Sequence, residues 1–501
     1  MNDNEIVKSN RANQSQSPSH FVGIGASAGG LEAIQELVSN MRSDAGLAYI
    51  IVQHLSPDYK SLMAELLAKY TEMPIVRIED GMQVKKDTIY LISPRKNIKI
   101  FHGKLISVDQ EGRHKGQLNL PIDILFQSMA EDIGDKAIGI VLSGTGSDGT
   151  RGIRAIKESG GMTVAQLPET AKFDSMPESA ISTGLVDFIL SPDVIPQQLN
   201  SYVKHPFARH SEQPFIPETD NGLARIFSLL RDRHKVDFTH YKPSTIIRRI
   251  ERRITINQCQ SLDEYKAFID QHPKEITTLF QELLIGVTSF FRDELVYDAI
   301  ADDVIPELFA PYKDVKQTEE FRVWVAGCSS GEEAYSMAML CHDYIEKHKL
   351  KIKVKIFATD VDSTAIEKAS IGIYSNSIAA DVSPEHLTKY FINRDEHYQI
   401  NREIRECVVF AQHDLTRDPP FTNIDLITCR NLMIYLQPVL QKKVLELFNF
   451  SLKSSGILVL GSSETIGDCE DLYEVINSKL KIFRTKGKRA LTNFTHNVNV
   501  S

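Results

Sequence analysis

The stretch from residue 20 to residue 41 restricts the fold most, because it joins an apolar run, a glycine-rich turn and a helical pattern in immediate succession. The apolar run is typical of a buried strand, and the later apolar spacing of three and four residues is typical of an amphipathic helix. The turn carries one nucleophilic side chain, Ser27. A strand, a tight turn and a helix in this order would raise Ser27 above the carboxyl end of a strand, beside helix N–H groups that favour negative charge.

Three interpretations of this turn stay open on the motif alone. The sequence GASAG from residue 25 fits a nucleophile elbow, in which small neighbours permit a strained turn around the serine. The glycines at positions 23 and 25, with Ala28, also fit a loose dinucleotide-binding fingerprint. In the third interpretation the glycines only allow the helix to pack closely against the strand.

The composition narrows the class of protein. A chain of 501 residues exceeds what one core usually holds, so two or three domains are expected. A formal net charge of −9 argues against general nucleic-acid affinity. Six cysteines without CxxC spacing or a histidine pair predict a reduced cytoplasmic protein without structural metal. No apolar run approaches ~20 residues, which argues against membrane insertion, and residues 1–18 are typical of a flexible leader.

Strand-like runs alternate with helical patterns over residues 19–205, which predicts an α/β domain with a largely parallel sheet. The expected strands lie at residues 21–24, 48–52, 89–92, 138–142 and 162–165. Two further polar side chains follow strand ends, because His54 ends the second run and Asp148 follows the fourth. In parallel α/β sheets the carboxyl ends of the strands form the rim where ligands bind, so Ser27, His54 and Asp148 are expected there together.

These three residue types suit acyl transfer. A serine hydroxyl becomes nucleophilic when a base takes its proton, and an acid orients that base. The glycines around Asp148 would let backbone N–H groups approach an oxyanion. The dinucleotide interpretation weakens, because the second strand ends at His54 where a ribose-binding acid is expected. A histidine at a strand end is also often only a hydrogen-bonded surface residue, and that interpretation stays open.

Four segments of this domain, GIGASAGG, VQHLSP, LSGTGSDGTRG and FDSMPESAI, resemble the catalytic domain of chemotaxis protein-glutamate methylesterases, the CheB-type enzymes. The resemblance spans essentially residues 19 to 190 and implies that Ser27, His54 and Asp148 are the catalytic residues. The chain differs from the family at Ala28, where threonine is frequent. Stand-alone enzymes of this type carry an N-terminal receiver domain, which the first 18 residues cannot hold, so the resemblance implies an esterase without that control in the same chain.

Prolines in a polar stretch predict a linker at residues 206–220 and a helical segment at 221–285. The run YKPSTIIRRIERRI from residue 241 predicts an amphipathic helix with its isoleucines on one side and its arginines on the other. The arginines are Arg248, Arg249, Arg252 and Arg253. This basic side could be simply solvated, could bind nucleic-acid phosphates, or could dock on an acidic protein helix.

A second strand, glycine turn and helix begins at residue 321, and the next predicted strand, at 354–358, ends at Asp360. An acid after the second strand suits a ribose, and the absence of a phosphate fingerprint favours a nucleoside ligand such as S-adenosylmethionine. The turn also precedes the acids Glu332 and Glu333, and a further strand at 424–429 precedes Arg430 and Asn431. The DPPF sequence at 418–421 resembles a motif of nucleic-acid base methyltransferases, but it precedes its strand, so it is expected to be a loop.

The segments YKPSTIIRRIERR, GVTSFFRD, VAGCSSGEEAYS, FATDVD, FAQHDL and DLITCRNLMIYL together resemble chemoreceptor glutamate methyltransferases, the CheR-type enzymes, across about residues 220–485. The resemblance implies receptor docking by the basic helix, and it places Arg292 and Tyr435 near the transferred methyl group. Gly286 and Asp414 replace asparagines that are frequent in the family. By position, the residues implied to line the S-adenosylmethionine site are Thr288, Arg292, Glu332, Asp360, Asp414, Leu415, Arg430 and Asn431.

The sequence thus predicts two doubly wound α/β domains, at 19–205 and 286–490, joined through a small helical subdomain and followed by a tail at 491–501. The expected protein is a cytoplasmic bifunctional enzyme of chemotaxis that methylates chemoreceptor glutamates and hydrolyses the resulting esters, with glutamine deamidation by the same route. Its expected partners are methyl-accepting chemoreceptors, with other signalling proteins in trans. The alternatives are a signalling scaffold with one or both sites inactive and, less favoured, a nucleic-acid methyltransferase.

Overall fold

The structure is a computed structural model that describes residues 17–54, 62–93, 96–109, 118–208, 216, 221–284, 286, 288–313, 318–395 and 397–487. It forms two compact units. The first comprises Met1–Gly222, Ile247–Glu275 and Ser375–Ala380, and the second comprises Leu223–Ile246, Ile276–Tyr374 and Asp381–Ser501. The predicted leader, linker and tail lie wholly or mostly outside the described residues, so their boundaries stay predictions.

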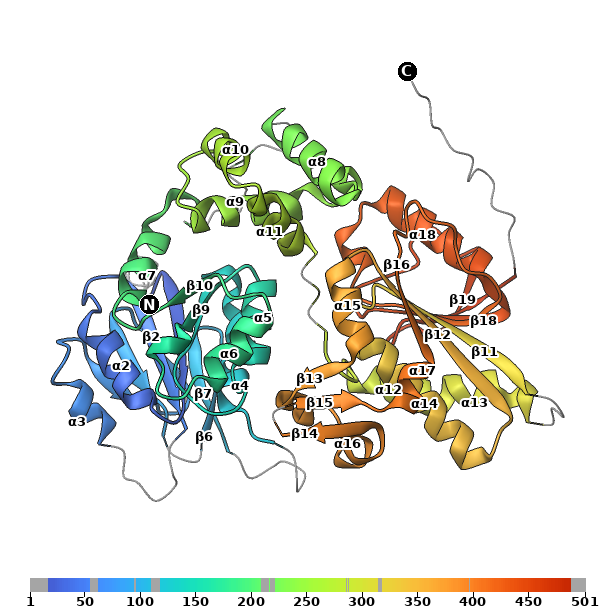
Figure 1. Cartoon of the computed structure of the whole chain (residues 1–501), viewed down its shortest axis with the longest axis horizontal. Helices are drawn as coiled ribbons and strands as arrows, with labels where there is room; N and C mark the ends of the chain where they lie inside the picture. Colours follow the sequence, from blue (N-terminus) through green and yellow to red (C-terminus); the bar gives the residue numbers. More distant parts are fainter. Residues whose placement is uncertain are drawn as a thin grey trace, which may run out of the picture. The chain divides into compact units, whose positions relative to one another are not determined.

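A seven-stranded sheet with the order β10-β9-β8-β1-β2-β5-β3 forms the centre of the first unit (Figure 1). Every pairing in it is parallel, so the prediction of a parallel α/β sheet is confirmed. Its strands are β1 (His20–Ala26), β2 (Leu47–Gln53), β3 (Ile75–Arg77), β5 (Thr88–Leu91), β8 (Ala137–Val141), β9 (Met162–Gln166) and β10 (Phe188–Leu190).

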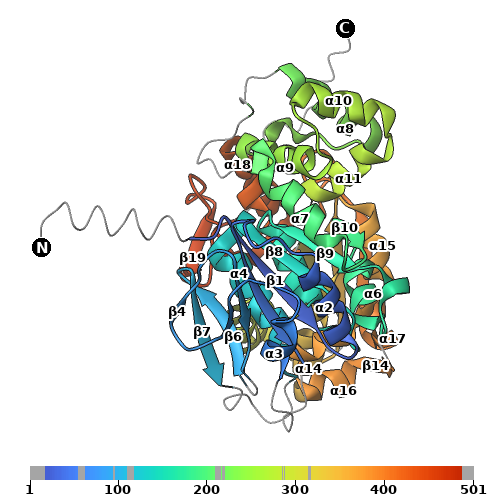
Figure 2. The same cartoon turned by 90° about the vertical axis from the view of Figure 1, so that its left-hand side faces the viewer.

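Helices cover both faces of this sheet because its strands are apolar on both sides. Val22 and Ile24 of β1 face one core, whereas Phe21 faces the other. Figure 2 shows α2 and α4 to either side of β1. The helices on the first face are α2 (Gly30–Ser39), α3 (Met63–Leu67) and α7 (Ile195–Lys204). Those on the second face are α4 (Pro121–Ile133), α5 (Thr150–Glu158) and α6 (Ser175–Ser182).

A small antiparallel sheet with the order β4-β7-β6 packs on the second face through helix α4 and supplies Ile98, Ile100 and Leu105 to that core. Its strands are β4 (Met82–Gln83), β6 (Lys96–Phe101) and β7 (Lys104–Asp109).

The second unit also has a seven-stranded sheet, with the order β16-β12-β11-β17-β18-β20-β19. The first five strands are parallel and the last two pair antiparallel. The strands are β11 (Glu319–Ala326), β12 (Ile352–Asp360), β16 (Val408–Gln412), β17 (Ile424–Cys429), β18 (Leu452–Leu460), β19 (Tyr473–Asn477) and β20 (Ile482–Thr485). The order reverses between β11 and β17, and such reversals are where α/β sheets bind ligands at their carboxyl edge.

The core of this unit lies on the face covered by α18 and contains the single tryptophan, Trp324, which is fully buried. The indole nitrogen of Trp324 donates a 2.9 Å hydrogen bond to Thr359 Oγ1 and so ties β11 to β12. The helices around the sheet are α12 (Glu294–Ala299), α13 (Ile305–Phe309), α14 (Glu332–His348), α15 (Ser363–Ile371), α16 (Pro384–Tyr390), α17 (Arg402–Glu406) and α18 (Pro438–Ser451).

Two smaller parts complete the chain. A three-stranded sheet has the order β13-β15-β14, with β13 (Ile373–Ser375), β14 (Phe391–Arg394) and β15 (His397–Ile400). The predicted helical segment contains α8 (Asn221–His234), α9 (Pro243–Ile256), α10 (Leu262–Gln271) and α11 (Lys274–Leu283). None of the helices in the described ranges combines the length and the apolar character needed to cross a bilayer.

Candidate active sites

Ser27, His54 and Asp148 follow strands β1, β2 and β8, and the parallel pairing of these neighbours brings their carboxyl ends to one edge. The His54 amide donates to the Ala26 carbonyl at 3.0 Å, and the Ser27 amide donates to the Ser143 carbonyl at 3.0 Å. These bonds continue the sheet beyond its last paired residues. They fix the backbone of the serine and of the histidine relative to the loop after β8.

The His54 imidazole and the Asp148 carboxylate are directly hydrogen-bonded. Nε2 of His54 lies 2.8 Å from Oδ2 of Asp148, whose side chain is only 3% exposed. Asp148 also accepts from the amides of Ile122 at 3.0 Å and Asp123 at 2.9 Å. Both amides belong to the first turn of α4, whose N–H groups lack partners within the helix and favour a negative charge. The helix therefore holds and stabilises the carboxylate that faces the histidine.

This arrangement defines which imidazole nitrogen is basic. A carboxylate oxygen accepts, so a bond from His54 to Asp148 uses an Nε2–H donor and leaves Nδ1 with a free lone pair. Ser27 is partly exposed, and its hydroxyl makes no hydrogen bond to any described residue. Bonds between a catalytic hydroxyl and its base are often formed only when substrate is bound.

The turn after β8 approaches the serine closely. A Cβ atom on Gly144 would lie 2.8 Å from the Ser27 Cβ and 2.2 Å from the Met176 sulfur, so only glycine fits there. The Gly144 amide donates to the Phe173 carbonyl at 2.9 Å. This amide, one of the predicted oxyanion donors, therefore has a partner already. Gly144 acts instead by allowing the chain to pass next to Ser27.

A second carboxyl, Asp123, lies beside Asp148 and was not found from the sequence. It is 1% exposed, and its Oδ1 accepts from the Gly152 amide at 2.7 Å. Its Oδ2 has no hydrogen-bond partner among the described residues. Burial raises the pKa of Asp123 well above its usual range, and the charge of Asp148 adds to the effect. Burial therefore favours the protonated form of Asp123, whereas Asp148 is the carboxyl that contacts His54.

A second group of polar residues lies at the carboxyl edge of the second sheet, at the turn between β11 and α14. Gly327 and Gly331 have positive φ values of 79° and 94°, which glycine adopts without strain. Asp360, at the end of β12, accepts from the Ser329 amide of this turn at 2.8 Å and from the Asp362 amide at 3.0 Å. Burial raises the pKa of Asp360. The acid after the second strand and the glycine turn are thus directly joined.

Arg430 follows β17 and lies in a polar cluster near this turn. Its side chain is 2% exposed, and its Nη2 donates to the Arg292 carbonyl at 2.8 Å and to Asp293 Oδ2 at 2.6 Å. Its Nη1 lies 3.6 Å from Glu333 Oε2. Among the described residues, Arg430 Nε and Glu333 Oε1 are buried without hydrogen-bond partners. Such atoms are typical of a site that binds a polar ligand.

The other residues that the resemblance implies for the methyltransferase site lie in different environments. Glu332 is buried and accepts from Ser330 Oγ at 2.7 Å, and Asp414 accepts from the Thr416 amide at 2.8 Å. Leu415 packs in the core beneath the sheet. Thr288 and Tyr435 are partly buried, and the Tyr435 carbonyl accepts from the Lys242 amide at 2.9 Å.

The chain departs from the family pattern at Gly286 and Asp414, and the structure shows what surrounds each of them. A Cβ atom on Gly286 would lie 2.8 Å from Ser329 Oγ, so a side chain there would require Ser329 to move. Tyr241, which the sequence did not single out, lies near Asp414 and Asp360. Burial and these two carboxylates raise the pKa of Tyr241. Tyr241 therefore lies at the same edge of the second unit as the two acids.

The helical spacing predicts that the four arginines share one side of α9, but they do not form one exposed surface. Arg248 is exposed, but Arg252 and Arg253 are each only 6% exposed. Arg253 forms a paired hydrogen bond with Glu275 at 2.8 and 2.7 Å. Arg249 instead donates to the last carbonyls of α5, and Arg252 donates to the carbonyls of Gly160 and Gly161 just after it, within the first unit. The periodicity placed the arginines on one side of the helix but could not show that other parts of the chain pack there.

The sequence DPPF at 418–421 lies in the loop between β16 and β17, as predicted. Asp418 Oδ2 accepts from the Asp414 amide at 2.7 Å. The Phe421 ring packs against Trp324 and Phe357, with centroid distances of 5.1 and 4.7 Å. The motif therefore has a structural role in holding this loop to the sheet.

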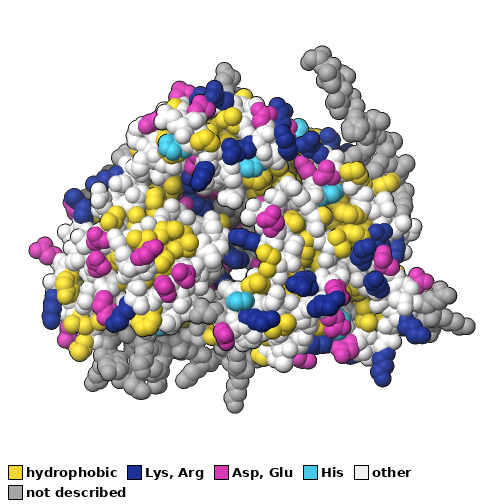
Figure 3. All heavy atoms as spheres, in the orientation of Figure 1, with side chains coloured by type: hydrophobic (Ala, Val, Ile, Leu, Met, Phe, Trp, Pro, Cys, Tyr) yellow, Lys and Arg dark blue, Asp and Glu magenta, His cyan; other side chains and the backbone are white. Residues whose placement is uncertain are grey.

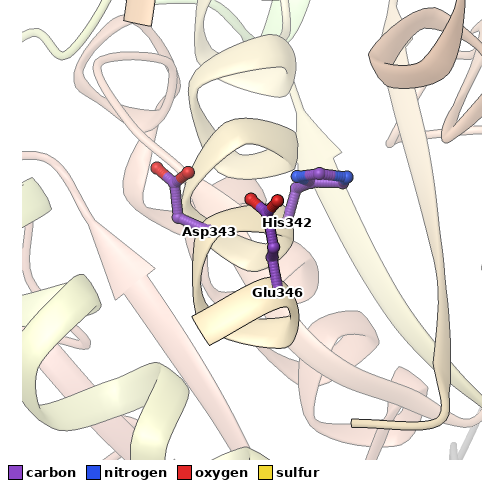
Figure 4. Close-up of side chains that lie close together, drawn as sticks. All are labelled: His342, Asp343 and Glu346. Carbon is purple, nitrogen blue, oxygen red and sulfur yellow. The ribbon is translucent and has the colours of Figure 1, made fainter. Parts of the chain in front are cut away.

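Helix α14 carries a separate cluster of His342, Asp343 and Glu346, whose ligand-type atoms lie within 4.8 Å of one another (Figure 4). The Lys389 ammonium lies 2.7 Å from Asp343 Oδ1 and 2.5 Å from Glu346 Oε2. His386 adds a 2.8 Å contact to Asp343. A lysine that already neutralises both carboxylates makes this cluster an ion-pair network between α14 and α16.

Three stretches of the chain match known protein families. Residues 22–199 match the family of CheB methylesterases. Residues 221–284 match the all-alpha domain of CheR methyltransferases, and residues 286–482 match their SAM binding domain. The matches follow the chain in this order. They therefore account for most of its length.

Individual relatives agree with these matches. A 104.1 kDa uncharacterised protein of Rhodobacter capsulatus is 38% identical over 84% of this chain, which spans only 46% of that protein. A Leptospira interrogans protein, named as a protein-glutamate methylesterase/protein-glutamine glutaminase, is 34% identical over 34% of this chain and 89% of its own length. The chemotaxis protein methyltransferase of Escherichia coli is 29% identical over 50% of this chain and 87% of its own length.

A solved structure, the CheB methylesterase catalytic domain of Thermotoga maritima, is 28% identical, with a TM-score of 0.34, and covers 36% of this chain and 97% of its own. The family matches, taken with the two sheets and their polar edges, identify the chain: it belongs to the CheB methylesterase and CheR methyltransferase families, with a domain of each in one polypeptide.

Proposed function

We propose that this chain is a cytoplasmic bifunctional enzyme of chemotactic adaptation that both methylates chemoreceptor glutamates and hydrolyses the methyl esters. The observation that carries the esterase half is the hydrogen bond between His54 and Asp148. His54 directly follows β2, and Ser27 directly follows the neighbouring strand β1. The relatives named as chemotaxis methyltransferases and as a methylesterase/glutaminase support the substrate class.

In the esterase half, Nδ1 of His54 would take the Ser27 proton as the hydroxyl oxygen attacks the ester carbonyl. The imidazolium would then donate this proton to the departing methoxide, which leaves as methanol. Water would cleave the acyl-serine by the same route and regenerate the glutamate. Asp148 would stabilise the imidazolium, and the amides of α4 keep its charge in place. A glutamine side chain would react equivalently, with ammonia as the leaving group.

In the transferase half, the residues at the edge of the second sheet fit S-adenosylmethionine. Asp360 is the acid after the second strand, where a ribose hydroxyl pair is expected, and its bonds to the glycine turn hold it in place. S-adenosylmethionine would supply the methyl group. A glutamate carboxylate is already nucleophilic at neutral pH, so the residues of this chain would act by positioning, with Arg292 and Tyr435 near the reacting atoms.

Of the four arginines on α9, only Arg248 is exposed and suited to receptor docking, since the others contact this chain. A nucleic-acid methyltransferase is disfavoured because DPPF packs in a structural loop. On the face drawn in Figure 3, basic and acidic side chains are interspersed. A scaffold without catalysis is the remaining alternative, and it predicts neither labelled receptor nor methanol.

The decisive experiment incubates the purified chain with methyl-labelled S-adenosylmethionine and chemoreceptor-bearing membranes. The expected result is base-labile label on the receptor followed by labelled methanol in solution. Label without methanol would contradict the esterase half, and the absence of label would contradict the transferase half. Receptor whose methylation-site glutamates are changed to alanine is the control, since it offers no acceptor carboxylate.

A further inference from the structure

Glu464, in the segment after β18, binds four backbone amides with one carboxylate. Its Oε2 accepts from Asn431 at 3.1 Å and from Gly461 at 2.6 Å. Its Oε1 accepts from Met433 at 2.7 Å and from Ile434 at 3.3 Å. The side chain is 4% exposed. Both oxygens are therefore committed to backbone N–H groups in a buried environment, where such bonds are strong.

Three of the four amides belong to the segment that follows β17. The same segment carries Arg430, Asn431 and Tyr435, which are assigned to the proposed transferase site. Asn431 has a φ of 59°, in the left-handed region that a residue with a side chain adopts at a cost. Such a conformation persists only where the surroundings hold it in place.

The contact between Glu464 and the segment after β17 leaves no room for a side chain at Gly461. A Cβ atom on Gly461 would lie 2.8 Å from the Asn431 amide nitrogen and 2.8 Å from Glu464 Oε2. Glycine at this position therefore lets the end of β18 approach the segment after β17. The parallel pairing of β17 with β18 brings the two segments to the same edge.

We propose that Glu464 is a positioning residue of the methyltransferase site, which fixes residues 431–434 by accepting the amides of Asn431, Met433 and Ile434. This inference rests on the proposed function of the second unit. A carboxylate suits this role because it is acceptor-only at both oxygens. Glutamine has nearly the same shape but replaces one oxygen with an NH2 donor, which would face two N–H donors. Two of the four bonds would then be lost, at least one of them from this segment, and the segment would relax from the Asn431 conformation.

The test compares Glu464→Gln with wild type and with Glu470→Gln, in which the same change is made at an exposed residue nearby. Binding of S-adenosylmethionine is measured by calorimetry, and methyl transfer to receptor is measured as kcat and KM. We expect Glu464→Gln to weaken cofactor binding about tenfold and to lower kcat ~10- to 100-fold, because small displacements of reacting groups have effects of this size. KM for the receptor and the methylesterase rate of the same chain should stay at wild-type values.

The role of Glu464 is overturned if Glu464→Gln binds cofactor and transfers methyl like Glu470→Gln. It is also overturned if calorimetry shows fewer binding sites per chain with unchanged affinity, since that result indicates partial unfolding. A wild-type chain that neither binds S-adenosylmethionine nor transfers methyl would overturn the proposed function itself. The wild-type measurement thus separates the two failures.

Discussion

Arg252 of helix α9 and Asp187, the residue before β10, form a buried ion pair within the first unit. The Asp187 side chain is fully buried, and it also accepts from Lys157 at 2.5 Å. Arg252 and Arg249 additionally donate to carbonyls of residues 157–161, where helix α5 ends. The last carbonyls of a helix lack partners and favour positive charge. The basic helix is therefore fixed to the CheB-type domain by its own arginines.

Removal of one partner should destabilise this contact strongly. Arg252→Leu removes one of the two cations that pair with the buried Asp187, and removing one partner of a buried ion pair costs about 3–5 kcal/mol. The free energy of unfolding, measured with urea by circular dichroism, should fall by this amount for the first unit. The matched control is Arg248→Leu, which removes an exposed arginine of the same helix. Equal effects of the two variants would contradict the importance of the ion pair.

The ion pair between Arg252 and Asp187 predicts that the stability of the fold depends on pH. Burial alone would raise the pKa of Asp187, but the charges of Arg252 and Lys157 outweigh it and hold the pKa well below its usual range. A carboxyl with a lowered pKa stabilises the fold above its unfolded-state pKa of about 3.9 and loses this effect as the pH falls further. The stability difference between wild type and Asp187→Asn should therefore be constant from pH 7 to about pH 4 and shrink below it. A difference that is unchanged at pH 2.5 would contradict the low pKa.

The contribution of Asp123 to stability should change with pH in the opposite direction to that of Asp187. Because burial raises its pKa, its contribution is most favourable below about pH 3.9 and decreases as the pH rises towards the folded-state pKa. Asp123→Asn keeps an oxygen for the Gly152 amide and has no proton to gain. The variant should gain stability relative to wild type as the pH rises above about 4, measured as urea midpoints. A wild-type advantage that grows with pH would show that Asp123 is ionised in the fold.

Substitutions in the proposed triad should separate the two activities. Ser27→Ala should lower methanol release by ~10⁴-fold or more and leave methyl transfer intact, because the serine lies in the other domain. Asp148→Asn should lower methanol release by about 10⁴-fold as well, since an amide can present donors to His54 Nε2 and favour the wrong tautomer. Methanol is measured enzymatically with methylated receptor. Retained esterase activity in Ser27→Ala would remove it as the nucleophile.

Asp360→Ala should weaken the binding of S-adenosylmethionine. The change removes the acceptor of the Ser329 and Asp362 amides and the expected ribose contact, and a hydrogen bond to a charged acceptor contributes about 1.5–3 kcal/mol. Calorimetry should therefore show a dissociation constant raised ~10- to 100-fold. Asp362→Ala, at a partly exposed residue two positions later, serves as the control. Unchanged affinity in Asp360→Ala would contradict its assignment.

Much of the fold follows from local sequence pattern. The strand expected at 48–52 is β2, which is one residue longer at each end. The strand expected at 138–142 is β8, which is shifted by one residue towards the N-terminus. Parallel pairing then brings the residues after neighbouring strands to one edge, which is why Ser27, His54 and Asp148 could be grouped from sequence. The structure adds the hydrogen bond between His54 and Asp148, and the catalytic role of these residues is a proposal.

The sequence by itself determined which residues alternate into strands and helices and which polar side chains follow a strand, because these properties depend on near neighbours along the chain. Only the tertiary structure decided that Arg252 is buried against Asp187, that Asp123 lies beside Asp148, and that Glu464 holds residues 431–434. These contacts join residues 25 to 65 positions apart in the sequence. Helical periodicity shows which side of α9 a residue occupies, but the partner that covers that side is set by how distant segments pack.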